Sequence, residues 1–535
     1  MYFTVEEVST LLKSLNVSKA SVPDNVPNRI LKECADILSP SLTRIFNISF
    51  QKGIFPSLWK HAFVTPVHKK DDRSNVKNYR PISLTCVVSK IFERCIVNKI
   101  YPHLSQMIYP LQHGFIKGRS TTSQLMHVYD NINSGIENGG QIDAIFLDFA
   151  KAFDSVSHQL LIHKLKSFGI HGKLLIWLAN YLSDRTQQVV LEGSVSSSLP
   201  VISGVPQGSI LGPLLFLLYI NDLPSHQSDK TKIALYADDA KIFHPINSLE
   251  DTLNLQQNLD RIISWSNTWQ MKFNVNKCKI ITLSRKRHKI NFFYNMNGTP
   301  LIRVSSITDL GITIQENLNW DTHINSAVKK ANGVLWMIKR TLGYGARARA
   351  KQCFYTSMVQ PIVEYGCNIW SPVSKKNLMH IEAIQRRATK YITNDNVANY
   401  KSRLIACNLL PLAFRRDYLD ANLLYKTIHG YADQYILSAL TFNYRKQYLI
   451  SNGINIGDIV VQIAKSETYK HYFTHRIAHI WNSIPTDIRS IPYGSNGSQF
   501  KLHLKRFFDD KFIRTFNPDN TCTWVCKCRC AFCRY

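Results

Sequence analysis

Residues 231–243, Thr-Lys-Ile-Ala-Leu-Tyr-Ala-Asp-Asp-Ala-Lys-Ile-Phe, are the stretch that decides the fold. Apolar residues alternate on both sides of two adjacent acids, Asp238 and Asp239. This pattern predicts a strand, a tight turn and a second strand, with the acids at the turn. Carboxylates in such a setting are costly to bury unpaired, so they need water, a cation or a metal. A solvated turn is the simpler interpretation, but a hairpin tip with two carboxylates also suits Mg²⁺, which shares its remaining ligands with phosphates.

A second acidic segment, residues 142–154, reads Ile-Asp-Ala-Ile-Phe-Leu-Asp-Phe-Ala-Lys-Ala-Phe-Asp. Residues 142–147 form an apolar strand that ends at Asp148, and Asp154 follows just before a helix-like stretch, residues 158–168. Strand ends are where open α/β sheets place their chemistry. Two distant strands that each bear an acid can converge in one sheet and hold two metal ions about 3.5–4 Å apart.

Between these two segments lies a rigid turn, Ser-Gly-Val-Pro-Gln-Gly-Ser-Ile-Leu-Gly-Pro, residues 203–213. Its prolines and glycines predict a loop, and the apolar residues 214–220 that follow predict a buried helix. A glycine-rich turn that opens a helix suits a phosphate or the close approach of a base. The turn is a weak signal alone and a stronger one beside the two acidic segments.

These three segments, in this order, resemble the palm of a reverse transcriptase, and more narrowly the enzyme of LINE-type (non-LTR) retrotransposons. Four further segments are similar to that family: a fingers motif, a template-side segment, the lysine motif after the active site and the primer-grip turn. They read NYRPISL (78–84), QHGFIKGRS (112–120), NVNKC (274–278) and DLGI (309–312). The resemblance is strong over residues 60–315 and weaker over residues 10–500.

Two features depart from the family pattern. The family commonly has a glycine before Pro-Asp near the N-terminus, whereas this chain has Val22, which does not readily adopt a positive φ, so we expect a different local turn. The chain also begins directly in the helix that precedes the fingers, so we expect no upstream endonuclease and no nicking activity.

The resemblance implies a two-metal site in the palm. Asp148 and Asp238 are the expected Mg²⁺ ligands, Asp239 would assist at the primer-side metal, and the backbone carbonyl of Phe149 could also bind. Mn²⁺ could replace Mg²⁺. The two ions would lower the pKa of the primer 3′-OH and neutralise charge on the triphosphate. Lys277 is the candidate general acid for pyrophosphate departure, although a plain surface lysine is the simpler interpretation.

The resemblance also implies the nucleotide-binding residues. Arg80 is the expected triphosphate ligand, since its planar fork suits phosphate, and Lys69, Lys70 or Arg73 would supply a second cation. Phe153 occupies the position of a bulky gate that excludes a ribose 2′-OH and so selects dNTPs, and core packing is its simpler role. Gln207 and Gly208 would shape the nucleotide pocket.

The charge balance agrees with a nucleic-acid polymerase. The 535 residues include 65 Lys and Arg against 37 Asp and Glu, a formal net charge of +28, which predicts salt-sensitive binding to a polyanion. Two basic runs are candidate contacts with nucleic acid, although each could be a solvated surface: Arg285, Lys286, Arg287 and Lys289, and Arg386, Arg387 and Lys390 on one helix face.

Twelve cysteines divide unevenly along the chain. Seven are scattered, as expected of reduced intracellular thiols. Five crowd into the last fourteen residues, where Cys522, Cys526, Cys530 and Cys533 could hold Zn²⁺. The alternation of Cys526, Cys528 and Cys530 suits a single tetrahedral site poorly, so a disordered reducible tail is the alternative.

We therefore expect an α+β fold: a right-hand polymerase with fingers, a palm of antiparallel sheet packed on helices and a helical thumb, followed by a mostly helical C-terminal region. The expected boundaries are an N-terminal helical extension (1–50), the reverse transcriptase domain (51–315, with fingers 51–135, palm 136–285 and primer grip 286–315), a helical thumb or connection (316–430), a C-terminal region (431–520) and a Cys-rich tail (521–535).

The expected function is that of an RNA-directed DNA polymerase that extends a DNA primer on an RNA template with dNTPs. An inactive relic that only binds nucleic acid, or a maturase-like protein on the same palm, is the alternative. The longest apolar run, Pro213–Ile220, is too short to span a membrane. We expect an intracellular protein, nuclear for work at a target DNA site, and the oligomeric state stays open.

Overall fold

The computed structural model describes residues 1–18, 24, 26–69, 71–137, 139–226, 230–443, 450–451, 454–455 and 457–515. Three expectations lie outside the described residues: the turn at Val22, the role of Lys70 and the zinc site of Cys522, Cys526, Cys530 and Cys533. Among the described residues, no helix is both long and apolar enough to cross a lipid bilayer.

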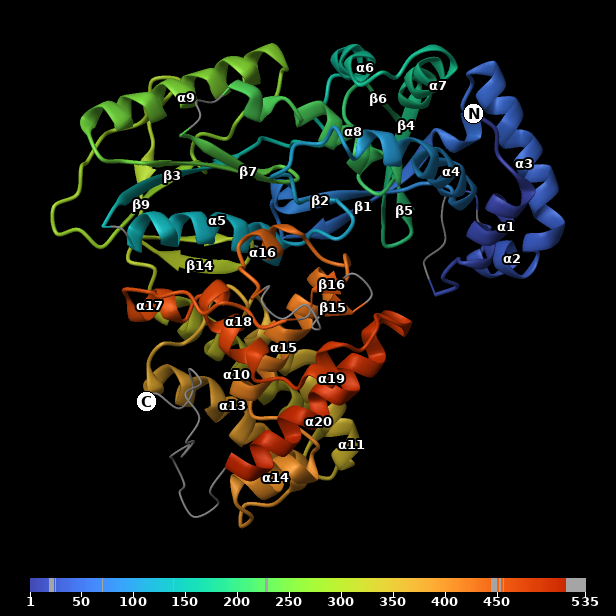
Figure 1. Ribbon diagram of the computed structural model, residues 1–535. Helices are drawn as coiled ribbons and strands as arrows, with labels where there is room; N and C mark the ends of the chain where they lie inside the picture. The colour runs from blue at the N-terminus through green and yellow to red at the C-terminus, as the bar shows by residue number, and fades with distance from the viewer. Residues whose placement is uncertain are drawn as a thin grey trace.

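A five-stranded sheet forms the centre of the fold (Figure 1). Its middle strand β3 pairs antiparallel with β8 on one side and with β9 on the other. The expected strand, turn and strand around Asp238 are confirmed as β7 and β8. In spatial order the strands are β12 (Ile302–Arg303), β9 (Lys279–Ser284), β3 (Gln141–Asp148), β8 (Asp239–Pro245) and β7 (Lys232–Tyr236).

Both faces of this sheet are covered, which explains why β3 is largely apolar and why its polar Gln141 and Asp143 are buried as well. Alternate side chains point to opposite faces, so Ala144 belongs to one hydrophobic core and Ile145 to the other. The first core includes helix α5 and the C-terminal helices. The second includes α6, α8 and α9. The bounds are α5 (Thr121–Glu137), α6 (His158–Ser167), α8 (Leu211–Ile220) and α9 (Leu249–Thr268).

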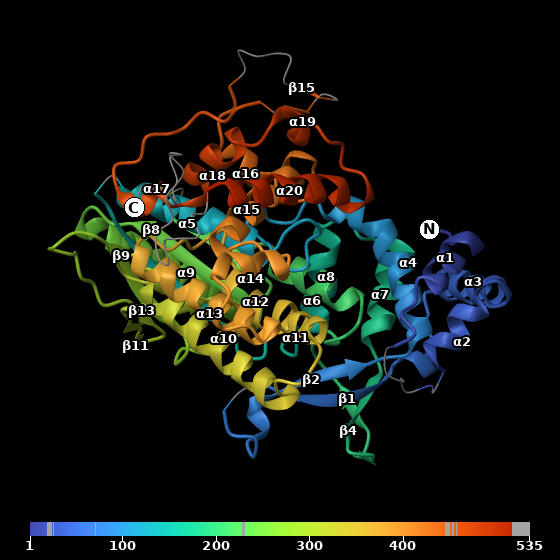
Figure 2. The same cartoon turned by 90° about the horizontal axis from the view of Figure 1, so that it is seen from below.

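A second sheet combines segments from distant parts of the sequence. Strand β1 pairs antiparallel with β2 and parallel with β4, and β4 also pairs with β5 and β6. Residues 185–201, which the sequence placed with the palm, therefore extend the sheet of the expected fingers (Figure 2). The strands are β1 (His61–His68), β2 (Tyr79–Leu84), β4 (Arg185–Leu191), β5 (Ser194–Val195) and β6 (Leu199–Val201).

The N-terminal helices pack against α4 and α7 beside this sheet. Helix α1 begins with a capping box in which Thr4 and Glu7 each accept from the other's backbone N–H, which leaves no free donor at those two positions. The helices are α1 (Val5–Lys13), α2 (Asn28–Glu33), α3 (Ala35–Lys52), α4 (Val87–Leu104) and α7 (Gly172–Leu182), with short turns at Ser57–Trp59, Val76–Asn78 and Leu223–His226.

The chain after residue 320 is mostly helical, as expected, and covers the α5 face of the central sheet (Figure 1). Its helices are α10 (Asp321–Leu342), α11 (Ala348–Phe354), a π-helical turn (Tyr355–Val359), α12 (Gln360–Glu364), α13 (Lys375–Thr393), α14 (Tyr400–Ala406), α15 (Leu412–Ile428), α16 (Tyr435–Ser438), α17 (Glu467–Lys470), α18 (Phe473–Asn482), α19 (Thr486–Arg489) and α20 (Ser498–Thr515). Three small hairpins complete the fold: β10–β11 (Asn295–Met296, Thr299–Pro300), β13–β14 (Ser306–Asp309, Ile312–Gln315) and β15–β16 (Ile450–Ser451, Ile454–Asn455).

Candidate active site

The central sheet brings the three candidate acids together. Asp148 is the last residue of β3 and is the direct cross-strand partner of Asp239, the first residue of β8. Asp238 lies in the turn between β7 and β8. Asp148 and Asp238 are half-buried, and Asp239 is exposed.

The turn that carries Asp238 is held from outside by the template-side segment. Ala237 adopts a left-handed conformation, with φ of 53°. Its backbone N–H donates to the side-chain Oε1 of Gln112 at 2.9 Å, and the N–H of Gly114 donates to the same oxygen at 2.8 Å. A Cβ on Gly114 would lie 2.2 Å from the Ala237 nitrogen. Residue 114 must therefore be glycine for the two backbones to approach this closely.

The acids repel one another. Desolvation raises the pKa of Asp238, and the charge of Asp148 raises it further, while Arg80 and Lys69 partly offset both effects. The pKa of Asp239 is raised to about 6. The largest cause is desolvation by the surrounding protein, and the second is the negative charge of Asp238. Like charges that gather in a partly desolvated site are the arrangement that a bound cation relieves.

Lys277 and the segment before β9 support Asp148. The Nζ of Lys277 lies 3.4 Å from Oδ2 of Asp148, at an exposed position. The N–H of Asn274 donates to the Asp148 carbonyl at 2.7 Å. The next residue, Phe149, is buried and stacks on Phe273 with ring centres 4.4 Å apart. The end of β3 is therefore fixed on both sides.

Phe153 lies beyond the acids with one face packed and part of the ring exposed. Its ring stacks on Phe216 of α8 at 4.4 Å and meets the edge of Phe115 at 5.9 Å. These contacts fix the orientation of the ring, so packing and a gating role are compatible.

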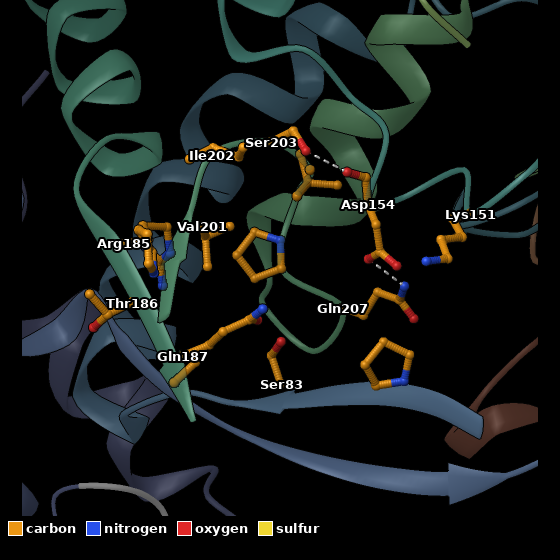
Figure 3. Close-up of a pocket in the computed structure, with 16 residues that line it drawn as sticks. Ser83, Lys151, Asp154, Arg185, Thr186, Gln187, Val201, Ile202, Ser203 and Gln207 are labelled. Atoms are coloured by element: carbon orange, nitrogen blue, oxygen red, sulfur yellow. Dashed lines mark hydrogen bonds between the residues drawn. The ribbon is translucent and has the colours of Figure 1, made fainter. Parts of the chain in front are cut away.

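The Val-Pro-Gln-Gly-Ser turn joins the two sheets. Its Gln207 carbonyl accepts from the N–H of Ser83 in β2 at 2.7 Å, and a Cβ on Gly208 would lie 2.3 Å from the Ser83 carbonyl oxygen. The side-chain amide of Gln207 donates to Asp154 at 3.0 Å (Figure 3). Beside this turn lies a cavity of about 280 Å³ that Lys151 and β4 also line.

A larger cavity of about 560 Å³ opens on the other side of the acids. Asp148, Asp239 and Lys277 line one wall, and the β13–β14 hairpin lines the other. Across its base, Lys241 of β8 pairs with the buried carboxylate of Asp309. The sequence did not reveal this ion pair or the contact of Gln112 with Ala237, because both join positions far apart in the chain.

The expected triphosphate cations lie at the exposed end of the β1–β2 hairpin. Arg80 of β2 and Lys69, which follows β1, are both exposed, and the Lys69 N–H donates to the Asn78 carbonyl at 2.8 Å. Arg73 is exposed in the connecting loop. Arg80 and Lys69 act on the charge of Asp238, whereas Lys70 lies outside the described residues.

The first basic run is partly engaged in ion pairs within the protein. Arg285 lies 3.5 Å from Glu137, and Lys289 lies 2.7 Å from Glu316. Lys286 and Arg287 are exposed. These two side chains therefore offer more to an external phosphate than their neighbours do.

The second basic run, on α13, is likewise divided. Arg386 packs its guanidinium over the Tyr400 ring at 4.5 Å. Arg387 donates to Asn332 of α10 at 2.9 Å and stays exposed, as does Lys390. The sequence predicted that Arg386, Arg387 and Lys390 share one basic helix face, but partial burial against Tyr400 of α14 separates Arg386 from the other two.

Helix α10 presents a basic face that the sequence reasoning did not single out. Lys329, Lys330, Trp336 and Arg340 are exposed along it, and the Arg340 guanidinium lies 5.4 Å from the centre of the Trp336 ring. The spacing of seven residues from Lys329 to Trp336 and of four from Trp336 to Arg340 is the signal that could have identified this face. Cations beside an exposed aromatic ring suit a nucleic-acid strand.

Comparisons with known proteins find a family match and several relatives of this chain. Residues 67–314 match the family described as reverse transcriptase (RNA-dependent DNA polymerase). The RNA-directed DNA polymerase from mobile element jockey of Drosophila melanogaster is 30% identical over 406 residues, which are 73% of this chain and 44% of the relative. The probable RNA-directed DNA polymerase from transposon BS of the same species is 31% identical over 415 residues, again 73% and 44%. The chain thus spans less than half the length of these relatives.

A solved structure of apo telomerase from Candida Tropicalis, truncated from the C-terminal domain, overlaps 54% of this chain and 60% of its own at 12% identity, with a TM-score of 0.34. An overlap this low supports no argument. The family match and the curated relatives carry the assignment: the chain belongs to the reverse transcriptases of LINE-type (non-LTR) retrotransposons.

Proposed function

We propose that this chain catalyses RNA-directed DNA synthesis, in which a DNA primer is extended on an RNA template with dNTPs. The observation that carries the proposal is the meeting of Asp148, Asp238 and Asp239 at the ends of β3 and β8, within the matched residues 67–314. The relatives from the jockey and BS elements are named as an RNA-directed DNA polymerase and a probable one.

Reverse transcriptases generally depend on a divalent metal, and the donor set here fits one. Among the described residues, no three His, Cys, Asp or Glu side chains form a preformed metal cage. Mg²⁺ does not need such a cage, because it binds through one or two carboxylates, waters and substrate phosphates. The mutual repulsion of Asp238, Asp239 and Asp148 supports a cation between them.

In the proposed assignment, Asp148 and Asp238 hold two Mg²⁺ ions, with Asp239 and the Phe149 carbonyl as further ligands, and Mn²⁺ can replace Mg²⁺. Bound ions would favour ionisation of the primer 3′-OH and neutralise developing charge. Lys277 would donate a proton to the departing pyrophosphate, a role that its position beside Asp148 permits.

The chain's other residues would position the nucleotide. Arg80 and Lys69 would bind the triphosphate, since both are exposed and both act on the Asp238 charge. Phe153 would lie under the sugar and exclude a 2′-OH. Gln207 and Gly208 would fix the pocket floor through their contacts with Asp154 and β2. Catalysis would then come from positioning and electrostatics rather than from covalent chemistry.

The template–primer duplex would lie along exposed basic residues beyond the palm. Lys286, Arg287, Arg387 and Lys390 remain available for phosphates, and α10 adds a face with Trp336. Extension of nicked target DNA would require the protein to enter the nucleus. We propose that the chain divides into the predicted fingers, palm, primer grip and thumb, and that residues 185–201 belong to both the fingers and the palm.

Primer extension on a homopolymer RNA template with Mg²⁺ tests the function. Asp238→Asn should lower extension by at least about 100-fold, because it removes metal-binding charge with little change in volume, while duplex binding stays close to that of the wild type. Asp510→Asn, at an exposed position of α20, is the matched control. An active Asp238→Asn variant would refute the metal assignment. An inactive wild type would favour the alternative of an inactive relic that only binds nucleic acid.

A further inference from the structure

The C-terminal region packs along α5, the helix that follows the template-side segment (Figure 1). The Tyr472 hydroxyl donates to the Met126 carbonyl at 2.7 Å, and the Tyr435 and His127 rings lie 3.8 Å apart. The Tyr435 hydroxyl also donates to Asp130 at 3.1 Å. Residues well beyond the matched 67–314 therefore contact the polymerase domain directly.

One of these contacts reaches the template-side segment itself. Oδ2 of Asp433 lies 3.3 Å from Nδ1 of His113 and 3.9 Å from Nε of Arg119. Its other oxygen, Oδ1, accepts from the N–H of Tyr435 at 3.1 Å, at the start of α16. The Asp433 side chain is only 10% exposed, so these partners are its principal surroundings.

The two partners of Asp433 lead directly to the catalytic turn. Arg119 Nη1 donates to the Gln112 carbonyl at 2.6 Å, and the His113 N–H donates to the Leu235 carbonyl of β7 at 2.9 Å. Gln112, which is 2% exposed, accepts from the Ala237 N–H through its side chain. The contacts of Asp433 with Arg119 and His113, followed by the hydrogen bonds that these two residues make, thus lead from Asp433 to the backbone beside Asp238.

The Nδ1 of His113 is hydrogen-bonded to the Ser123 hydroxyl at 2.9 Å, so His113 meets Asp433 as a neutral ring close to a carboxylate. Burial first, and then the nearby charge of Arg119, lower the pKa of His113 to about 3. The ring is therefore uncharged near neutral pH. The attraction between opposite charges in this cluster comes from Arg119, whose guanidinium is always protonated.

We propose that Asp433 is a positioning residue for the catalytic turn: through Arg119 and His113, the C-terminal region fixes Gln112 and so the backbone on which Asp238 stands. The consequence for catalysis rests on the proposed function, but the consequence for the turn does not. Polymerase activity then depends on a region that the reverse transcriptase family match does not include.

Hydrogen exchange by mass spectrometry on the full chain tests the positioning without reference to activity. In Asp433→Ala, peptides that cover residues 110–116 and 232–240 should exchange at least about tenfold faster, because the Ala237 N–H loses part of its support. Asp433→Asn keeps the size of the side chain and one acceptor oxygen but loses the charge and the second acceptor, so its effect should be smaller than that of Asp433→Ala. Asp487→Ala, at an exposed site in the same region, should change neither peptide.

Primer extension gives the second readout. Asp433→Ala should lower kcat by on the order of 10–100-fold, as expected for a small displacement of a catalytic group, with little change in duplex Kd and with partial recovery in Asp433→Asn. Unchanged exchange at residues 232–240, with faster exchange confined to α16, would overturn the proposal. If Asp433→Ala speeds exchange throughout the C-terminal region, Asp433→Asn is used instead, and its exchange at residues 232–240 is compared with its exchange in α16. An inactive wild type would defeat the proposed function and leave the exchange test valid.

Discussion

Replacing Lys241 with methionine tests the buried ion pair that joins the catalytic strand to the β13–β14 hairpin. The side chains of Lys241 and Asp309 are 3% and 5% exposed, and the Tyr129 hydroxyl donates to the same carboxylate at 3.2 Å. Methionine nearly preserves the volume of lysine but leaves the Asp309 charge buried without a cation. We expect the free energy of unfolding to fall by about 3–5 kcal/mol, the cost of breaking a buried pair from one side.

Removing both charges should cost much less than the two single changes together. In a Tyr129→Phe background, which avoids an orphaned hydroxyl, Lys241→Met with Asp309→Leu replaces the pair with apolar groups of similar size, a change that is often neutral. Urea unfolding followed by circular dichroism measures all four corners of the cycle, and Lys286→Met at an exposed position is the control. A single-variant loss below about 1 kcal/mol, or a double-variant loss equal to the sum, would refute the reasoning.

Three further predictions follow from the site. Phe153→Val should raise rNTP use relative to dNTP use in single-nucleotide extension, since it removes a steric block; unchanged discrimination in a folded variant would leave Phe153 a packing residue. Arg387→Gln with Lys390→Gln should flatten the plot of log K against log salt by about two units, similarly for all sequences, and an unchanged slope would place the duplex elsewhere. The pKa of Asp239 is raised to about 6, from the 3.8 that is usual for an aspartate. The folded state therefore binds the extra proton between those pH values, and metal-free stability falls as pH rises through them. Asp239→Asn should therefore stabilise the metal-free protein above pH 6 and give no gain below about pH 4, as thermal melts with chelator can show.

Local patterns in the sequence predict local structure well. The alternation around Asp238 predicted the β7–β8 hairpin, because a hairpin depends on residues within a few positions of one another. The apolar run of residues 214–220 gave a buried helix, although α8 begins three residues earlier, at Leu211. These features arise from backbone geometry and periodic burial.

Contacts between distant segments were beyond this reasoning. Nothing near residue 185 indicates that β4 pairs with β1, more than a hundred residues away. A basic run likewise does not reveal which cations are already paired: Arg285 meets Glu137 and Arg386 meets Tyr400, whereas Lys390 stays exposed. Such pairings are decided by how elements pack, which a single sequence without covariation does not record.

The division of the apolar core by the central sheet has a consequence for biosynthesis. Ala144 of β3 and Ile324 of α10 belong to the same core, about 180 residues apart. At a translation rate of roughly 5–20 residues per second, the face of the sheet that α10 covers stays exposed for on the order of 10–40 s during synthesis. The nascent polymerase domain would therefore be a substrate for chaperones until the C-terminal helices emerge, and translation stalled before α10 should leave it prone to aggregation.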